Sequence, residues 1–345
     1  MAKIDILDKI RPYKTVSIIG MDKNVGKTTV LNYILKEARG KLSLGLTSIG
    51  RDGEDKDRVT LTKKPKIYVE RGTLIATAKQ CLFSSDITKE IINSTGIHTP
   101  MGEVIIAKAL SDGYVELGGP SINAYMQSIC AELLDYRVDL VLVDGALSRK
   151  TSASPAITEA AILSTGASLG RDINKVVEMT SYTVKLLSIE QELNKDVLSL
   201  YENSLRNARV GIIYRGGDIE SLDVMTSLEA SKEIVQKLNG NVSHVVIRGI
   251  VTDSILEDIM NSTDRYKGVT FLVEDGTKLF IKQETLYKFQ GQGAIIKAFD
   301  GINLKCVTCN PKAPYGYEFD RYKFLEELKK NISLPVYDVV GGEGY

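Results

Sequence analysis

The residues most able to do chemistry in this chain lie between Gly20 and Thr29, where the sequence reads GMDKNVGKTT. An apolar run, TVSIIG, precedes this stretch, and a run with helical spacing, VLNYILKEA, follows it. A strand that ends in a short loop and continues as a helix directs backbone N–H groups and the positive end of the helix dipole at one point. We therefore expect a phosphate-binding loop here, and the alternative is an ordinary strand–helix turn with a surface lysine.

Each residue of this loop has an expected role towards a bound nucleotide. Lys27 is placed to reach the β- and γ-phosphates, the Thr28 hydroxyl to bind Mg²⁺, and Thr29 to contact the α-phosphate. The loop backbone that would surround the phosphates belongs to Asp22, Lys23, Asn24, Val25 and Gly26. The usual pattern has four residues between its first glycine and the Gly-Lys pair, whereas five separate Gly20 from Gly26.

Carboxylates that could hold Mg²⁺ follow two other predicted strands. Asp52 and Glu54 come just after LGLTSI, and Asp144 ends the apolar run of DLVLVDG. Because the carboxyl ends of parallel strands meet at one edge of a sheet, these groups are expected near the loop. We expect Lys27, Asp52 and Asp144 to act in catalysis, and we expect the metal ligands to be Thr28, Asp52, Glu54 and Asp144. The alternatives are a solvated acidic turn at residues 52–55 and a turn cap at Asp144.

The elements that would position these groups alternate between short β-branched runs and longer helical runs, which is typical of βαβ units around a parallel sheet. Strands are expected at 15–20, 42–49, 66–78, 103–109, 114–119, 140–145, 160–166, 244–251, 269–274, 304–309 and 335–340. Helices are expected at 28–38, 86–93, 122–135, 172–190, 227–238, 253–261 and 320–331. Turn signals at Arg71-Gly72 and Asp112-Gly113 predict two antiparallel hairpins added to the parallel core.

Two segments are expected along the chain. Residues 1–204 would form the nucleotide-binding core. Residues 205–345 would form a C-terminal α/β segment, which is either a second domain or a completion of the same sheet.

Composition limits the partners and the chemistry. Lys and Arg together number 44, as do Asp and Glu, in 345 residues. This balance favours neither a nucleic acid nor a membrane as partner. With two His and four Cys, a His-rich metal site and a disulfide framework are not expected. No apolar run approaches the roughly 20 residues that span a bilayer, and the N-terminus lacks a signal-peptide pattern, so we expect a cytoplasmic protein.

The loop resembles the Gly-Thr-Asp-Thr-Glu-Val-Gly-Lys-Thr loop of dethiobiotin synthetases and the related cobyrinic acid diamide synthetases. The spacing is identical, and the matching residues are Gly20, Asp22, Val25, Gly26, Lys27 and Thr28. The resemblance implies an α/β fold with a mostly parallel, dethiobiotin synthetase-like P-loop NTPase sheet that carries the antiparallel hairpin additions. It also implies a metal-binding Asp at Asp52.

The resemblance also bears on the nucleotide base and on dimerisation. It implies an adenine-reading Asn at Asn310, for which the alternative is a turn residue. Relatives that dimerise across their nucleotides carry a Lys where this chain has Asp22, and Lys23 comes one residue late. Activation of a partner's nucleotide by this lysine is therefore not expected, and a homodimer is an alternative that the sequence leaves open.

Over most of its length, the chain resembles the smaller P-loop component of the lysine 5,6-aminomutase reactivase family. The stretches that carry this resemblance, in order, are SIIGMDKNVGKTT, LTSIGRDGE, LGGPS, VDGALSRKTSASPAITEAAILSTGAS and PVYDVV. The resemblance implies Mg²⁺-dependent ATP hydrolysis that drives release of damaged cofactor from an adenosylcobalamin-dependent aminomutase. It also implies two partners, a MutS-like ATPase subunit and the aminomutase client.

Two other functions stay open at this point. One is a dethiobiotin synthetase-like ligase that uses ATP to activate a small carboxylate or carbamate. It would need a second lysine near the γ-phosphate, for which the candidates are Lys63, Lys64 and Lys66. The other is a nucleotide-sensing adaptor that binds ATP without turnover.

Overall fold

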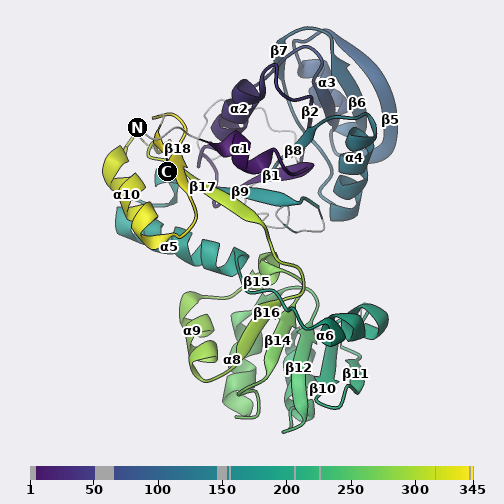
Figure 1. Ribbon diagram of the computed structural model, residues 1–345, viewed down its shortest axis with the longest axis vertical. Coiled ribbons are helices and arrows are strands. Elements are labelled where there is room, and N and C mark those ends of the chain that lie inside the picture. The colour runs from purple at the N-terminus through teal and green to yellow at the C-terminus, as the bar shows by residue number, and fades with distance from the viewer. Residues whose placement is uncertain are drawn as a thin grey trace. The chain divides into compact units, whose positions relative to one another are not determined.

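Two compact units make up the chain in the computed structural model (Figure 1). The structure describes residues 5–50, 66–145, 154, 157–205, 207–224, 227–314, 316–341 and 343–344. The first unit comprises Met1–Val184 and Asn303–Tyr345, and the second comprises Lys185–Ile302. The second unit is thus inserted into the sequence of the first.

The first unit is built on a ten-stranded sheet with the order β19-β18-β17-β9-β1-β8-β2-β4-β6-β5. Its strands are β1 (Thr15–Gly20), β2 (Leu44–Ser48), β4 (Leu74–Ala78), β5 (Lys89–Thr99), β6 (Gly102–Ala109), β8 (Leu140–Asp144), β9 (Ala160–Gly166), β17 (Leu304–Asn310), β18 (Val336–Asp338) and β19 (Glu343–Gly344). All neighbours from β18 to β4 pair in parallel, whereas β19, β6 and β5 pair antiparallel. The expected α/β class, with a mostly parallel sheet and antiparallel additions, is confirmed.

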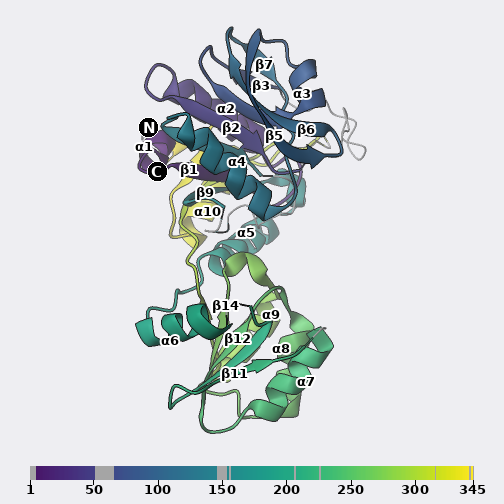
Figure 2. The ribbon, with the colours of Figure 1, turned by 90° about the vertical axis from the view of Figure 1, so that its right-hand side faces the viewer.

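Helices cover both faces of this sheet. They are α1 (Ile6–Ile10), α2 (Lys27–Ala38), α3 (Lys79–Ser84), α4 (Asn123–Asp135), α5 (Ile173–Leu187) and α10 (Arg321–Asn331). Helix α2 buries a stripe at helical spacing, from Val30 to Ala38, against the face that carries Ile18 and Leu142. Helix α4 packs on the opposite face, which carries Val143, and Figure 2 shows α4 lying across it. Burial of the apolar stripe of α2 against the sheet fixes the position of the first residue of this helix relative to the ends of the strands.

The antiparallel part pairs differently from the two expected hairpins. The turn at residues 70–73 is present, with Gly72 at φ 97° and Thr73 N–H donating to the Glu70 carbonyl. However, β3 (Ile67–Val69) pairs with β7 (Gly113–Val115), and β4 pairs with β6. The two strands that flank an expected turn therefore do not pair with each other. Each pairs instead with a strand that flanks the other turn.

The helix expected at 86–93 is wrong, because most of this range belongs to β5. Its isoleucines have helical spacing, but the segment is rich in β-branched residues, which favour a strand when a partner is available. That partner is β6, reached through a turn at residues 100–101.

The division of the chain also differs from the expected boundary between residues 204 and 205. That point lies in the short π-helix Tyr201–Leu205 of the second unit. The last 43 residues of the chain, 303–345, belong to the first unit, where β17, β18 and β19 complete its sheet. Only this part of the expected C-terminal segment extends the first sheet.

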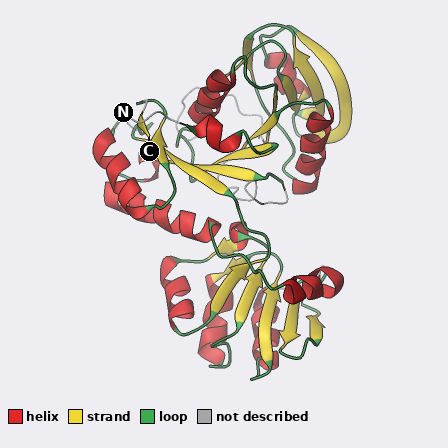
Figure 3. Cartoon of the chain, in the orientation of Figure 1, coloured by secondary structure: helices red, strands yellow, loops and turns green. Residues whose placement is uncertain are grey.

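The second unit has its own five-stranded sheet, with the order β11-β10-β12-β14-β16. Its strands are β10 (Val210–Tyr214), β11 (Ile219–Leu222), β12 (Val242–Ile247), β14 (Thr270–Val273) and β16 (Ile295–Ala298), with a separate pair, β13 (Val251–Thr252) and β15 (Leu279–Phe280). Its helices are α6 (Lys195–Leu200), α7 (Ser227–Lys237), α8 (Asp253–Ser262) and α9 (Gln283–Gly291). Strands β12, β14 and β16 are parallel and alternate with α8 and α9 (Figure 3).

Residues 118–120, with the sequence Gly-Gly-Pro, pack closely on the carboxyl ends of β2 and β4. Ala78 N–H donates to the Gly118 carbonyl at 2.7 Å, and Gly50 N–H donates to the Pro120 carbonyl at 3.2 Å. Between these contacts, a Cβ placed on Gly119 would lie 2.0 Å from the carbonyl oxygen of Ser48. Only glycine fits there without displacing the end of β2.

We predict that Gly119→Ala lowers the free energy of unfolding by about 3 kcal/mol, because its methyl group overpacks against backbone that cannot move aside cheaply. Chemical denaturation measures this change. Gly170→Ala is the matched control, since Gly170 has an extended backbone and its nearest contact is an ordinary 3.8 Å. Equal stabilities of the two variants would contradict the close approach at Gly119.

Candidate functional site

The loop between β1 and α2 turns sharply at two residues with left-handed backbone. Asn24 has φ 59°, and Gly26, at the N-cap position of α2, has φ 96°. Between them Val25 is 1% exposed and anchors the loop on the protein interior. Glycine adopts such φ values without strain, and asparagine does so more readily than most residues. Gly26 and Asn24 thus have a conformational reason for their positions.

The first turn of α2 carries no acidic residue of its own, and its N-cap residue, Gly26, has no side chain to accept a hydrogen bond. The first N–H groups of a helix have no acceptor within the helix, and the helix dipole adds partial positive charge there. Thr28 and Thr29 lie in this turn, and both are partly buried. The arrangement is suited to a negatively charged ligand.

Lys27 lies in the hollow of the loop. Its Nζ donates a hydrogen bond to the Asp22 carbonyl oxygen at 3.0 Å. A Cβ on Gly20 would lie 2.7 Å from this Nζ and 2.8 Å from the Val25 side chain. The lysine therefore occupies space that exists only because β1 ends in glycine.

The electrostatics of this lysine reflect its position. Burial lowers the pKa of Lys27, and the negative charges of Asp144 and Asp22 act in the opposite direction. A buried ammonium group is stabilised by an added anion more strongly than an exposed one, because less water competes for it. Lys27 is therefore suited to hold an anion in the hollow of the loop.

Asp144 ends β8, the strand next to β1, and lies on the same face of the sheet as α2. In register, Ile18 of β1 is paired with Asp144, which is paired with Ser48 of β2. Ile18 contributes to the core under α2, and residues paired across a sheet share its face. Asp144 is partly buried and Ser48 is buried. The structure thus brings a carboxylate and a hydroxyl to the edge where Lys27 lies.

Asn310 ends β17 and contacts the loop directly. Its Nδ2 donates to the Asn24 carbonyl at 2.9 Å, and its Oδ1 accepts from Lys312 N–H at 3.1 Å. A Cβ on Gly26 would lie 3.3 Å from the Asn310 Cβ. In this structure Asn310 braces the loop, and its adenine-reading role stays a prediction.

The remaining predicted residues fall into two groups. Asp22 accepts the N–H of Lys23 through its Oδ1 at 2.7 Å, which shapes the start of the loop. Asp52 and Glu54 lie outside the described residues. The described candidates, Asp22 to Thr29, Asp144 and Asn310, thus all belong to the strand ends and the loop at one edge of the sheet.

Sequence reasoning missed two residues at this edge. Ser48 is the register partner of Asp144, and it could have been found as the polar residue that ends the second apolar strand. Gly166 ends β9, where a Cβ would lie 2.7 Å from the Asn310 carbonyl and 3.4 Å from the Val25 Cα. The glycine at the end of this predicted strand was visible in the sequence. Its contact with Asn310 was not, because it depends on the pairing of β9 with β17.

These residues fit a nucleoside triphosphate with Mg²⁺. An ammonium group has three donors, and the bond to the Asp22 carbonyl uses one of those of Lys27, so the others could reach phosphate oxygens. Thr28, Asp144 and Ser48 could supply the few oxygen ligands that proteins commonly give to Mg²⁺, which retains phosphate and water ligands as well. Among the described residues, no group of three or more His, Cys, Asp or Glu side chains is placed to hold a metal ion.

Comparison of the chain with protein-family models, curated proteins and solved structures finds no match. In the described parts of the chain, every helix is too short or too polar to cross a bilayer.

The lowered pKa of Lys27 predicts a pH-dependent effect on stability. The folded chain releases this proton at lower pH than the unfolded chain, for which the ordinary value is 10.5. Between these two pKa values the unfolded state binds more protons, so this residue makes the stability of the unsubstituted protein rise with pH. Methionine does not titrate.

We therefore expect the stability of Lys27→Met, relative to the unsubstituted protein, to fall as pH is raised from neutrality towards 10.5. Chemical denaturation at a series of pH values, without nucleotide, measures the difference. Lys323→Met, at an exposed position of α10, controls for the loss of a lysine. A relative stability that increases with pH would contradict burial of the Lys27 ammonium group.

Proposed function

We propose that this chain is a Mg²⁺-dependent P-loop ATPase that binds the triphosphate of ATP on residues 20–29. The observation that supports this most strongly is the position of Lys27, held in a hollow bounded by Gly20 and beside Asp144. Left-handed backbone at Asn24 and Gly26 and a first turn of α2 without an acidic residue of its own support it further. In an ordinary strand–helix turn, a partly buried lysine directed into the loop would only be unfavourable, because burial of its charge costs free energy.

The chain's residues would act mainly through position and charge. Lys27 would neutralise negative charge on the β- and γ-phosphates. It would stabilise the transition state more than the bound nucleotide, because negative charge moves onto the leaving oxygen during the reaction. Thr28 and Asp144 would hold Mg²⁺. When bound, the nucleotide would supply the phosphoanhydride bond that is broken, and Mg²⁺ would reduce the negative charge of its phosphates. Asn310 would keep the loop in its binding conformation through its bond to Asn24.

The use of this ATPase cycle is proposed from the ordered sequence motifs. They support a reactivating factor that uses hydrolysis to release damaged cobalamin from an aminomutase, together with a MutS-like ATPase subunit. The ligase alternative requires a second lysine near the γ-phosphate. Lys63 and Lys64 lie outside the described residues, and the Lys66 Nζ lies over the Tyr114 ring at 5.9 Å, on the β3–β7 side of the unit. We therefore prefer the ATPase.

We predict that Lys27→Ala weakens Mg²⁺–ATP binding by about 100-fold, because it removes a charged hydrogen-bond donor from buried phosphates. We also predict that Asp144→Asn retains nucleotide binding but lowers turnover by about 100-fold. Calorimetry and a phosphate-release assay measure these effects, with Lys323→Ala as the control. If both variants kept the affinity and turnover of the unsubstituted chain, this site would not be the ATPase site.

The proposed client has a separate test. With purified adenosylcobalamin-dependent lysine aminomutase whose cofactor has been inactivated, we expect ATP hydrolysis to rise severalfold and cobalamin to be released in the presence of the MutS-like subunit. Absorbance of free cobalamin reports the release, and Lys27→Ala is the negative control. Turnover that depends instead on a small carboxylate would favour the ligase, and binding without turnover would favour the adaptor.

A further inference from the structure

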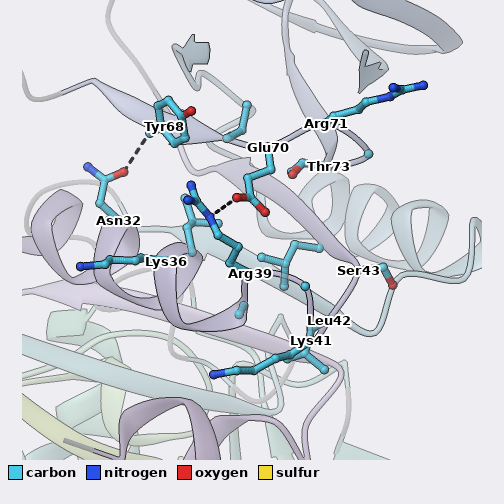
Figure 4. Close-up of a pocket in the computed structure, with 16 residues that line it drawn as sticks. Asn32, Lys36, Arg39, Lys41, Leu42, Ser43, Tyr68, Glu70, Arg71 and Thr73 are labelled. Atoms are coloured by element: carbon cyan, nitrogen blue, oxygen red, sulfur yellow. Dashed lines mark hydrogen bonds and ion pairs between the residues drawn. The ribbon is translucent and has the colours of Figure 1, made fainter. Parts of the chain in front are cut away.

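A cavity of about 720 Å³ lies in the first unit, at the end of α2 that is remote from Lys27 (Figure 4). It is bounded by the second half of α2, the segment that joins α2 to β2, and β3 with the turn that follows it. At about 1.5 Å per residue, Lys27 and Ala38 are about 16 Å apart along the helix. The cavity is therefore separate from the loop at residues 20–29.

The lining of this cavity is strongly basic. Its charged members are Lys36, Arg39, Lys41 and Arg71, against the single carboxylate of Glu70. Among the residues that the structure describes, Lys36, Lys41 and Arg71 form no ion pair. The basic residues come from α2, from the segment after it, and from the turn at residues 70–73. Folding thus gathers positive charge from three segments around one concave surface.

Within the cavity, Arg39 already forms an ion pair with a carboxylate of the chain, that of Glu70. Arg39 Nε pairs with the Glu70 carboxylate, and Figure 4 shows the two side chains facing each other. The side chains of Arg39 and Glu70 are 54% and 33% exposed, so water weakens their attraction. A ligand anion could therefore take the place of Glu70 at little cost.

The cavity also offers an apolar surface next to this arginine. Leu42, which is partly exposed, lines it above the buried side chains of Leu35 and Val69, and the Arg39 guanidinium lies 5.9 Å from the centre of the Tyr68 ring. Asn32 holds Tyr68 in place, because its Oδ1 accepts from the Tyr68 N–H and its Nδ2 donates to the Lys66 carbonyl, both at 3.1 Å. A cation beside an aromatic ring and aliphatic side chains suits a ligand with an anionic end and an apolar body.

We propose that this cavity binds a small organic anion, in which a carboxylate or phosphate group pairs with Arg39 in place of Glu70 and an apolar or aromatic body packs against Tyr68. The volume lies within the range of about 300–1,000 Å³ that is usual for small-molecule sites. The proposal does not depend on the function of the loop at residues 20–29, since none of those residues lines the cavity.

The chain contains no Trp, so one introduced Trp reports on this cavity alone. In Tyr68→Trp, we expect saturable changes in fluorescence with phenyl phosphate or benzoate, and none with neutral benzyl alcohol. If only one of the two anions changes the fluorescence, its acidic group, phosphate or carboxylate, is the one that the cavity prefers. Leu42→Trp is a second reporter, for use if Tyr68→Trp does not fold. No saturable response to either anion up to about 10 mM, or an equal response to benzyl alcohol, would overturn the proposal.

Substitutions of the central ion pair in the Tyr68→Trp background test the exchange of carboxylates. Arg39→Gln should weaken binding of the anion by about tenfold or more, because it removes a charged hydrogen-bond partner. Glu70→Gln should strengthen binding by about two- to fivefold, because it removes the competing carboxylate. Lys323→Gln, on α10, should leave affinity unchanged. Weaker binding in Glu70→Gln, or unchanged affinity in Arg39→Gln, would contradict the exchange.

Discussion

The candidate site depends on one constraint, the accommodation of the Lys27 ammonium group inside its own loop. The space for this group exists because β1 ends at Gly20, where any side chain would collide with the lysine. Burial of the charge is unfavourable and lowers its pKa, and it is offset in part by Asp144 and Asp22. A partly buried cation gains more from a bound anion than a fully solvated one does, because less water competes for it.

The surrounding fold turns this local arrangement into a site. The parallel order β17-β9-β1-β8-β2 brings the ends of strands distant in sequence to one edge, so that Asn310 supports the loop from one side and Asp144 lies on the other. The buried stripe of α2 fixes both of its ends on the sheet. One helix thereby contributes its N-terminus to the loop and its C-terminal half to the basic cavity, and the two sites share no residue.

Much of the site was predictable because it is local in sequence. The strand, the glycine-containing loop and the helix from residue 15 to residue 38 follow from apolar periodicity and the Gly-Lys-Thr-Thr sequence alone. Asp144 was predictable as the polar end of an apolar strand. By contrast, the exchange of partners between β3, β4, β6 and β7 depends on which strands meet in space. The return of the chain from the second unit to the first sheet was not predictable, because nothing in the residues of β17 shows which of the two sheets it joins. The hairpin of β10 and β11 was also not predicted, because its turn contains the polar, glycine-rich residues 215–218.

Hydrogen–deuterium exchange with and without Mg²⁺–ATP tests the central claim most directly. If Lys27 and the loop amides receive a triphosphate, exchange in residues 20–30 should slow on addition of nucleotide, and exchange in residues 210–222 of the second unit should not change. In Lys27→Ala the protection should be lost at the same nucleotide concentration. Unchanged exchange across residues 20–30 at saturating nucleotide, or protection confined to the second unit, would contradict the account.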